Sequence, residues 1–417
     1  MLSKLITFLA LYLPFQLALN PAAGIDLASV RVFILLIFFF WLADSLKNKK
    51  FIIQKNWTTA FVGIFLFLNL FSIFFARNPD WSLRKLLYLF SIFPIYFVAS
   101  TIINNQEKAK KLLSALVLSG ALASLIGILQ FLSQFIFGLD NLLNFWKNHF
   151  AVPFLGRTFS QSVFEYSSWL VNISGQTYFR AISVFPDPHM FSMYLGLLWP
   201  ISLFLYIKHP RKIWLFSTIL IFLADILTFS RGGYLGLFFG AIILFFVFWK
   251  KISPKFKLGG LVVASLFIIF FTIPNPITTR FFSSFDPNEG SNAGRLAMWR
   301  AAEKEISEKP IFGTGLGNFP LAVNPRAAYR QPIYAHNTYL DIAVETGLPS
   351  ALAFLGILLS AIFYFIKKSK NDIAYSGLAI GLVIFSVHSL VETGIYSPVV
   401  LTLLLFLVSL ASVQKVH

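Results

Sequence analysis

The sequence contains no cysteine, and it is poor in charged residues. Without thiols, the chain can form neither disulfides nor thiolate metal sites. Only 12% of the residues are charged, against roughly 25% in a typical soluble domain. In contrast, 57% are hydrophobic, and the mean hydropathy is +0.75. Since a water-soluble core cannot bury this much apolar surface, we expect a membrane protein.

Long apolar runs recur along the 417 residues. A helix needs roughly 17–25 mostly apolar residues to cross a bilayer. No small-residue cleavage site follows the first run, so we interpret it as an uncleaved span rather than a signal peptide. The fold class is therefore predicted as all-α, a single transmembrane domain over residues 1–417. Two long loops, about 138–187 and 275–349, would contain short helices. The predicted spans, about twelve, are 4–19, 26–45, 57–76, 82–103, 112–137, 188–207, 213–229, 234–249, 258–274, 350–366, 373–391 and 396–413.

The 34 basic residues are unevenly divided between the two sides of this arrangement. Nineteen lie on the side that holds both termini, in short loops such as 47–55, 108–111 and 250–257, and all of these except Arg211 are lysine. By the positive-inside rule that side is cytoplasmic. We therefore predict a bacterial inner-membrane protein with cytoplasmic termini and periplasmic long loops. Because the charges cluster in topology-setting loops, we predict no nucleic-acid partner despite the net charge of +17.

The opposite side is rich in arginine rather than lysine. A guanidinium group is a planar, always-charged fork that binds phosphate or carboxylate at two points. An outer face of this kind suits a phosphate-bearing lipid substrate. Alternatively, individual arginines pair with acidic residues of the same loops or with lipid headgroups. Eleven of the fifteen basic residues on this side are arginine, namely Arg31, Arg77, Arg84, Arg157, Arg180, Arg231, Arg280, Arg295, Arg300, Arg326 and Arg330.

Arg231 interrupts an apolar stretch from about 213 to 249, beside a Gly-Gly pair. A charge at membrane depth costs on the order of 2.5–3.5 kcal/mol, so such residues usually face a cavity and serve a function. The alternative is an interfacial arginine that snorkels to the headgroups. Asp225 is a second charge in this stretch, and it would either hold an arginine or be a buried structural partner. Arg180 precedes an extended, proline-rich entry to the next span, and local sequence alone does not decide its role.

The second long loop is predicted to contain an amphipathic helix. Ser291 or Asn292 can cap this helix, which would run to about residue 307. We interpret it as an interfacial helix with Trp299 at headgroup level and Arg295 near headgroup phosphates. The glycine-rich segment 313–317 follows, and it lacks the strand and the Gly-Lys-Ser sequence of a nucleotide loop, so we predict a turn.

His336 precedes a short predicted helix that Asn337 would cap and Gly347 would end. At the positive end of that helix, imidazolium is disfavoured and the ring is expected to be neutral, as a general base requires. The same helix end attracts anions. Alternatively, His336 is bonded to loop backbone. His388, within an apolar span near Glu392, is expected to be structural. No spacing of His, Asp and Glu predicts a metal site, and no cofactor is expected.

Taken together, these segments resemble the O-antigen ligase and polymerase family of bacterial membrane glycosyltransferases. In ligases of this family, a histidine is followed by Asn, Ser or Gln, then by nine residues and a glycine; His336, Asn337 and Gly347 fit that spacing. The chain departs from the usual pattern at Ser350 and at His189. The matching pieces, in order, are the Arg180 segment, Ser230-Arg231-Gly232-Gly233, Gly294-Arg295 with Trp299, and the His336 segment.

The resemblance implies a glycan donor linked to undecaprenyl pyrophosphate and presented at the periplasmic face. The glycan would pass to an acceptor hydroxyl, on a lipid core or similar molecule, with inversion and without a metal. Arg180 and Arg231 would hold the pyrophosphate and offset charge on the leaving group. His336 would orient or deprotonate the acceptor, while Arg295, Asn337 and Ser230 would contribute to substrate binding.

Two alternative functions are compatible with the sequence. Within the family, the chain could be a polymerase that extends a glycan on its carrier, although the spacing around His336 favours a ligase. In a different class, it could be a transporter of an anion or a lipid. Transporters tend to carry charges near the bilayer midplane and inverted repeats, whereas this chain has its charges at the outer surface and no visible repeat.

Overall fold

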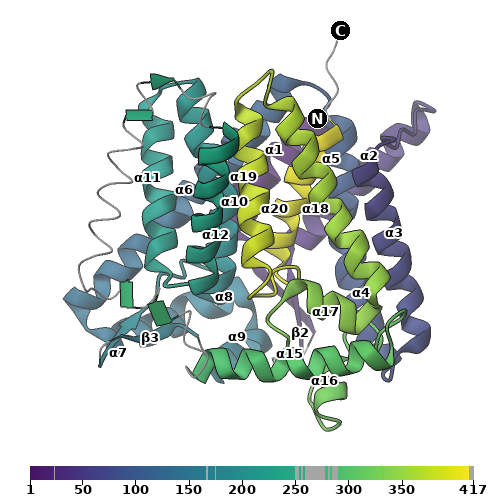
Figure 1. Cartoon of the computed structure of the whole chain (residues 1–417), viewed down its shortest axis with the longest axis vertical. Coiled ribbons are helices and arrows are strands. Elements are labelled where there is room, and N and C mark those ends of the chain that lie inside the picture. Colours follow the sequence, from purple (N-terminus) through teal and green to yellow (C-terminus); the bar gives the residue numbers. More distant parts are fainter. Residues whose placement is uncertain are drawn as a thin grey trace.

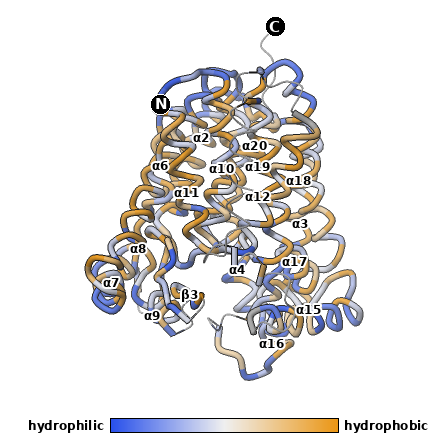
Figure 2. Tube along the Cα trace, turned by 60° about the vertical axis from the view of Figure 1, so that its left-hand side comes forward, coloured by the Kyte–Doolittle hydropathy of each residue, from blue (hydrophilic) through white to orange (hydrophobic). Residues whose placement is uncertain are grey.

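The computed structural model describes residues 1–22, 24–165, 168–173, 175–248, 253–254, 257–258, 278–279, 282–283, 290–329, 331 and 333–412. Helices dominate these residues, and most stand roughly parallel as a bundle (Figure 1). Hydrophobic residues cover the upright helices, while hydrophilic residues gather at the two ends (Figure 2). A polytopic helical membrane protein is therefore confirmed.

The number of predicted spans is confirmed only in part. Six helices are long and apolar enough to cross a membrane, in Ser29–Lys47, Trp57–Phe75, Pro79–Ile102, Gln106–Phe137, Pro188–Lys208 and Leu348–Lys368. Four shorter apolar helices accompany them, in Leu2–Phe15, Arg231–Phe246, Ala374–His388 and Pro398–Ser412. The predicted span 213–229 forms a 16-residue helix. The predicted span 258–274 lies outside the described residues from residue 259 onward.

The N-terminal half contributes one side of the bundle. A short hairpin of β1 (Ala18–Ala22) and β2 (Ile25–Ala28) separates the first two helices, a feature that the hydropathy pattern did not predict. The helices are α1 (Leu2–Tyr12), α2 (Ser29–Lys47), α3 (Trp57–Phe71), α4 (Pro79–Ile92), α5 (Pro94–Ile102) and α6 (Gln106–Phe137).

The first long loop folds into short helices and a β-hairpin. Gln134 of α6 holds the hairpin of this loop. Its side chain accepts a hydrogen bond from the Phe179 amide (2.8 Å) and donates one to the Phe179 carbonyl (3.1 Å). The elements are α7 (Leu139–Trp146), α8 (Val152–Leu155), α9 (Arg157–Glu165), β3 (Leu170–Ile173) and β4 (Gln176–Phe179).

The C-terminal half provides the core. Its upright helices are α10 (Pro188–Lys208), α11 (Lys212–Leu227), α12 (Arg231–Ile243), α18 (Leu348–Lys368), α19 (Ala374–His388) and α20 (Pro398–Ser409). Asp187 caps α10 by accepting hydrogen bonds from two amides of its first turn, and Pro188 suits the first helical position. Helix α10 packs closely on α19, because a Cβ atom at Gly381 would lie only 2.6 Å from the carbonyl oxygen of Leu197.

The second long loop lies across the end of the bundle opposite the two termini (Figure 1). The predicted helix in this loop is confirmed as α15 (Gly290–Glu308), followed by α16 (Phe319–Val323) and α17 (Thr338–Thr346). The face of α15 that carries Trp299 and Ala302 packs against Val344 and Ala335. The Trp299 indole donates a hydrogen bond of 2.9 Å to the Ala335 carbonyl. This face therefore packs on protein, whereas an interfacial amphipathic helix would turn it toward lipid.

Candidate functional site

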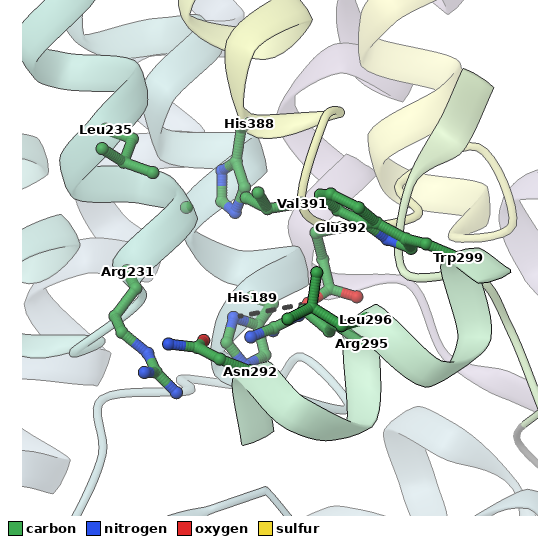
Figure 3. A pocket seen from close by; sticks show the side chains of 11 residues that line it. His189, Arg231, Leu235, Asn292, Arg295, Leu296, Trp299, His388, Val391 and Glu392 are labelled. Carbon is green, nitrogen blue, oxygen red and sulfur yellow. Dashed lines mark hydrogen bonds and ion pairs between the residues drawn. The ribbon is translucent and has the colours of Figure 1, made fainter. Parts of the chain in front are cut away.

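A cavity of about 290 Å³ opens at the loop end of the bundle, between α10, α12, α15 and the turn after α19. Apolar and polar side chains alternate around it, and Figure 3 shows the two arginines and the carboxylate projecting from different elements. The lining residues are His189, Arg231, Gly232, Leu235, Asn292, Arg295, Leu296, Trp299, His388, Val391 and Glu392.

Arg231 occupies the first turn of α12 and is only 5% exposed. Ser230 caps the helix by accepting a hydrogen bond from the Gly233 amide at 3.3 Å. An Arg231 guanidinium nitrogen and the Asn292 amide nitrogen each donate to the Ser283 carbonyl, both at 3.1 Å. The predicted placement of Arg231 at a cavity is therefore confirmed, and α15 supplies its neighbour Asn292.

Glu392 is the centre of the charge network at this cavity. One carboxylate oxygen accepts a hydrogen bond of 2.9 Å from Nδ1 of His336. The other oxygen lies 3.3 Å from an Arg295 guanidinium nitrogen and 3.7 Å from Nδ1 of His189. The Glu392 side chain is 8% exposed, so little solvent screens these contacts. Three elements that are far apart in the sequence thus meet at one buried carboxylate.

This network reverses the expected electrostatics of His336. Burial alone would lower the pKa of His336, but the charge of Glu392 and its hydrogen bond raise the pKa above its ordinary value. Burial would likewise raise the pKa of Glu392, but the nearby charges of His336, His189 and Arg295 hold it well below its usual range. The prediction that the helix end keeps His336 neutral considered only a partial charge. The Glu392 carboxylate adds a full charge at hydrogen-bond distance, and its effect on the pKa has the opposite sign.

The backbone around His336 is held in an uncommon conformation. His336 has a φ of 49°, in the left-handed region that non-glycine residues seldom adopt. Asn337 caps α17 by accepting hydrogen bonds from the amides of Tyr339 and Leu340, and Gly347 ends the helix with a φ of 88°, so both predictions are confirmed. Asp341 accepts a hydrogen bond from the Ala335 amide, which fixes the segment leading into His336.

Arg180 lies behind the cavity rather than in its wall. It is 2% exposed, and it donates hydrogen bonds to the carbonyls of Thr228 (2.7 Å) and Ser168 (3.0 Å). Burial raises the pKa of Asp187 to about 6, and the positive charge of Arg180 opposes that rise. Arg180 therefore ties the first long loop to the turn that precedes Arg231, and it adds positive potential at the start of α10.

Two further predicted site residues, Ser230 and Asn337, serve as helix caps and are not in the cavity lining. Ser230 is fully buried, and its hydroxyl oxygen lies 3.0 Å from Nδ1 of His189 and 3.3 Å from Nε2 of His388. His388 was expected to be structural, and it both packs in the core and lines the cavity. Asp225 pairs with the Ser192 hydroxyl at 2.5 Å.

Sequence reasoning did not assign Glu392, His189 or Asn292 to the site. Glu392 carried one usable signal, because it is an isolated acid between two apolar runs. His189 and Asn292 carried none, since their roles arise only from tertiary contacts. Among the residues that the structure describes, no group of three or more His, Asp or Glu side chains could hold a metal ion.

Residues 216–355 match the family model described as O-antigen ligase. This stretch of the chain is therefore similar to the O-antigen ligase family. The matched residues include Arg231, Arg295 and His336, so the resemblance drawn from the motifs is confirmed. Arg180 and Glu392 lie outside the matched stretch, and the structure connects them to it.

Individual relatives match at low identity, and some of them are named as polysaccharide ligases. An uncharacterized protein of Haemophilus influenzae is 29% identical over 189 residues, which cover 40% of this chain and 47% of that protein. A Rickettsia bellii protein named "Putative polysaccharide ligase" is 24% identical over 315 residues, covering 72% of this chain and 66% of its own length. A similarly named Rickettsia conorii protein is 25% identical over 175 residues, covering 39% and 40%. The chain thus spans between two fifths and two thirds of these curated relatives.

Proposed function

We propose that this protein transfers a glycan from undecaprenyl pyrophosphate to an acceptor hydroxyl, on a lipid core or a similar molecule. The observation that carries the proposal is the Glu392 carboxylate. It joins a histidine, His336, to an arginine, Arg295, at the edge of a cavity that also holds Arg231. A base for the acceptor and cations for a diphosphate are thereby placed around one site.

The donor diphosphate fits the cavity wall by charge. Arg231 and Arg295 would grip its oxygens, and the Asn292 amide would donate an additional hydrogen bond. Both guanidinium groups are largely shielded from water, so their interaction with a diphosphate is stronger than at an exposed surface. Arg180 would act through position, because its hydrogen bonds hold the turn that presents Arg231.

The reaction is a displacement at the anomeric carbon of the donor sugar. The acceptor oxygen forms the new C–O bond while the bond to the phosphate oxygen breaks, and the diphosphate leaves with the electron pair. His336 takes the hydroxyl proton; its Nδ1 is held by Glu392, so Nε2 is the nitrogen that acts. The arginines stabilise charge that develops on the leaving group. Attack opposite the leaving group inverts the anomeric configuration, and in this proposal the arginines take the place of a metal.

The orientation proposed for the protein follows from the same geometry. The first turns of α10 and α12 line the cavity together with α15, and α15 lies at the end of the bundle opposite the two termini (Figure 1). The positive-inside rule predicts that the lysine-rich side, which holds both termini, is cytoplasmic. The cavity would then open at the periplasmic face of the inner membrane. A lipid-linked donor presented there would place its diphosphate at headgroup depth.

The test is a reconstitution of the full chain with purified lipid-linked donor, with and without an acceptor lipid. We expect glycan on the acceptor lipid, which identifies a ligase; longer chains on the carrier would identify a polymerase instead. His336→Ala should reduce transfer about 10²–10⁴-fold, the usual contribution of a general base. His149→Ala, an exposed histidine of the first long loop, is the matched control and should keep full activity. Full activity in His336→Ala would reject its role as the base.

A further inference from the structure

A second cavity, also of about 290 Å³, lies at the other end of the bundle. Helix α10 connects the two sites: it begins beside His189 in the first cavity and ends at Lys208 in the second. Its 21 residues separate the two cavities by about 30 Å, the thickness of a hydrocarbon core. The second cavity is therefore at the headgroup level of the opposite leaflet.

The walls of this cavity divide into a polar rim and an apolar interior. The rim consists of Gln106, Glu107, Lys110, Lys208, His209 and Asp372. The interior is formed by Ala109, Leu113, Leu205, Ala374, Tyr375, Leu378 and Leu410. A phospholipid has the same division, since a charged headgroup is attached to an apolar chain. A soluble anion would use the rim but not the interior.

The rim contains two lysines and two carboxylates, and Lys111 beside it adds a third lysine, so cations are in excess. Each carboxylate already has a lysine: Asp372 is 2.6 Å from Lys208, and Glu107 is 2.7 Å from Lys111. The ammonium nitrogen of Lys110, in contrast, lies 3.2 Å from Nε2 of His209, so it faces another base rather than an acid.

The surroundings of His209 are cationic as well. Burial lowers the pKa of His209, and the charges of Lys110, Lys208 and Arg211 lower it further, while Asp372 opposes them. The neutral His209 ring can accept a hydrogen bond from the Lys110 ammonium group, but among the described residues no carboxylate pairs with Lys110 to offset its charge. Basic pockets between membrane helices on the cytoplasmic side characteristically bind phospholipid headgroups.

We propose that this second cavity is a binding site for an anionic phospholipid, such as phosphatidylglycerol or cardiolipin. The phosphodiester lies between Lys110 and His209, and one acyl chain runs along Leu113, Leu205 and Leu378. The lipid bridges α6, α10 and α19, so it stabilises the packed bundle by mass action. This inference does not depend on the glycan-transfer reaction.

The experiment uses the full-length protein in detergent, with bound lipids counted by native mass spectrometry and thermal unfolding measured in parallel. Phosphatidylglycerol should be retained and should raise Tm, whereas phosphatidylcholine should do neither. Lys110→Gln should weaken phosphatidylglycerol binding about fivefold, the usual effect of one basic residue near an anionic headgroup. The double variant Lys110→Gln/His209→Gln should lose more. The matched control is Lys47→Gln, a basic residue in the last turn of α2 that does not line the cavity, and it should bind as the wild type does.

Three results would overturn the proposal. Equal retention of phosphatidylcholine would show that the cavity does not select anions. Undiminished phosphatidylglycerol binding in the double variant would place the lipid elsewhere. An equal rise in Tm with inorganic phosphate alone would identify a free anion as the ligand. The variant Ala109→Trp, which fills the apolar interior, would then keep this rise in Tm. If the ligand is a lipid, Ala109→Trp should abolish the retention of phosphatidylglycerol, whereas Lys47→Gln should retain it.

Discussion

His336 and Glu392 form a hydrogen bond of 2.9 Å although 56 residues separate them in the chain. His336 stands before α17, and Glu392 lies in the turn between α19 and α20. The Thr338 hydroxyl reinforces the contact by donating to the Glu392 carbonyl at 2.9 Å. The dyad therefore exists only when the loop and the bundle are packed together, and its chemistry depends on both.

Replacement of Glu392 by glutamine should change the pH dependence of the transfer rate. The carboxylate raises the pKa of His336, so the acid limb of kcat/KM in the wild type should have its midpoint above 6.5. Without that charge, burial and Arg295 lower the pKa, and they outweigh Asp341, which raises it less. The midpoint in Glu392→Gln should therefore fall below 6.5, although the variant keeps a hydrogen-bond acceptor.

The control for this pH experiment is Glu303→Gln, which removes an exposed acid of α15. Its pH profile should match that of the wild type. If the acid limb of Glu392→Gln stays where it is in the wild type, then His336 is not the group that titrates, and its assignment as the base fails.

Replacement of Arg231 should weaken donor use specifically. A charge-assisted hydrogen bond contributes roughly 1.5–3 kcal/mol, so kcat/KM for the lipid-linked donor should fall about 10- to 100-fold in Arg231→Ala. Arg231→Lys keeps the charge but not the planar fork, and its activity should be intermediate. Arg300→Ala, on an exposed position of α15, should retain wild-type kinetics. A rise in KM for the acceptor, with KM for the donor unchanged, would show that Arg231 contacts the acceptor instead.

Arg180 should differ from Arg231 in its effect on stability. Arg180→Ala leaves the buried carbonyl of Thr228 and the half-buried carbonyl of Ser168 without this donor, and an unsatisfied buried group costs roughly 1–3 kcal/mol. Thermal unfolding in detergent should therefore show a lower Tm for Arg180→Ala, accompanied by loss of activity. Arg231→Ala should lose activity with little change in Tm. A wild-type Tm with a raised donor KM in Arg180→Ala would indicate direct donor contact.

Much of the local structure could be predicted from the sequence. The cap at Asn337 and the helix end at Gly347 follow from residue types that satisfy helix termini. The position of Arg231 at a cavity follows from the cost of an unsolvated charge. The approximate extent of α15 follows from its periodicity, although the helix begins at Gly290, before Ser291 and Asn292, the predicted cap residues. Each of these signals is contained in a short stretch of chain.

The assembled site could not be predicted in the same way. Glu392 meets His336 and Arg295 only through the packing of α15, α17 and the turn after α19, and no local pattern encodes that meeting. The expected direction of the His336 pKa shift was incomplete for this reason, because a helix end was weighed without the carboxylate. The membrane spans could be located from apolar runs, but their lengths depend on packing. Packing also decides that one face of α15 lies against protein.

Occupation of the cavity by a diphosphate should strengthen His336 as a base through Glu392. Arg295 and His336 share the Glu392 carboxylate. A diphosphate attracts Arg295, so Glu392 loses a cation that offsets its charge, and its effect on His336 grows. Inorganic pyrophosphate should therefore raise the midpoint of the His336 titration, as followed by histidine NMR of the full-length protein with His336→Gln for assignment. By linkage, pyrophosphate should bind more tightly at a pH where His336 is protonated.

The direct field of the diphosphate also acts on His336, and Glu392→Gln separates the two contributions. A smaller shift in that variant means that the coupling passes through the carboxylate, whereas an equal shift in both proteins would show that Glu392 plays no part in it.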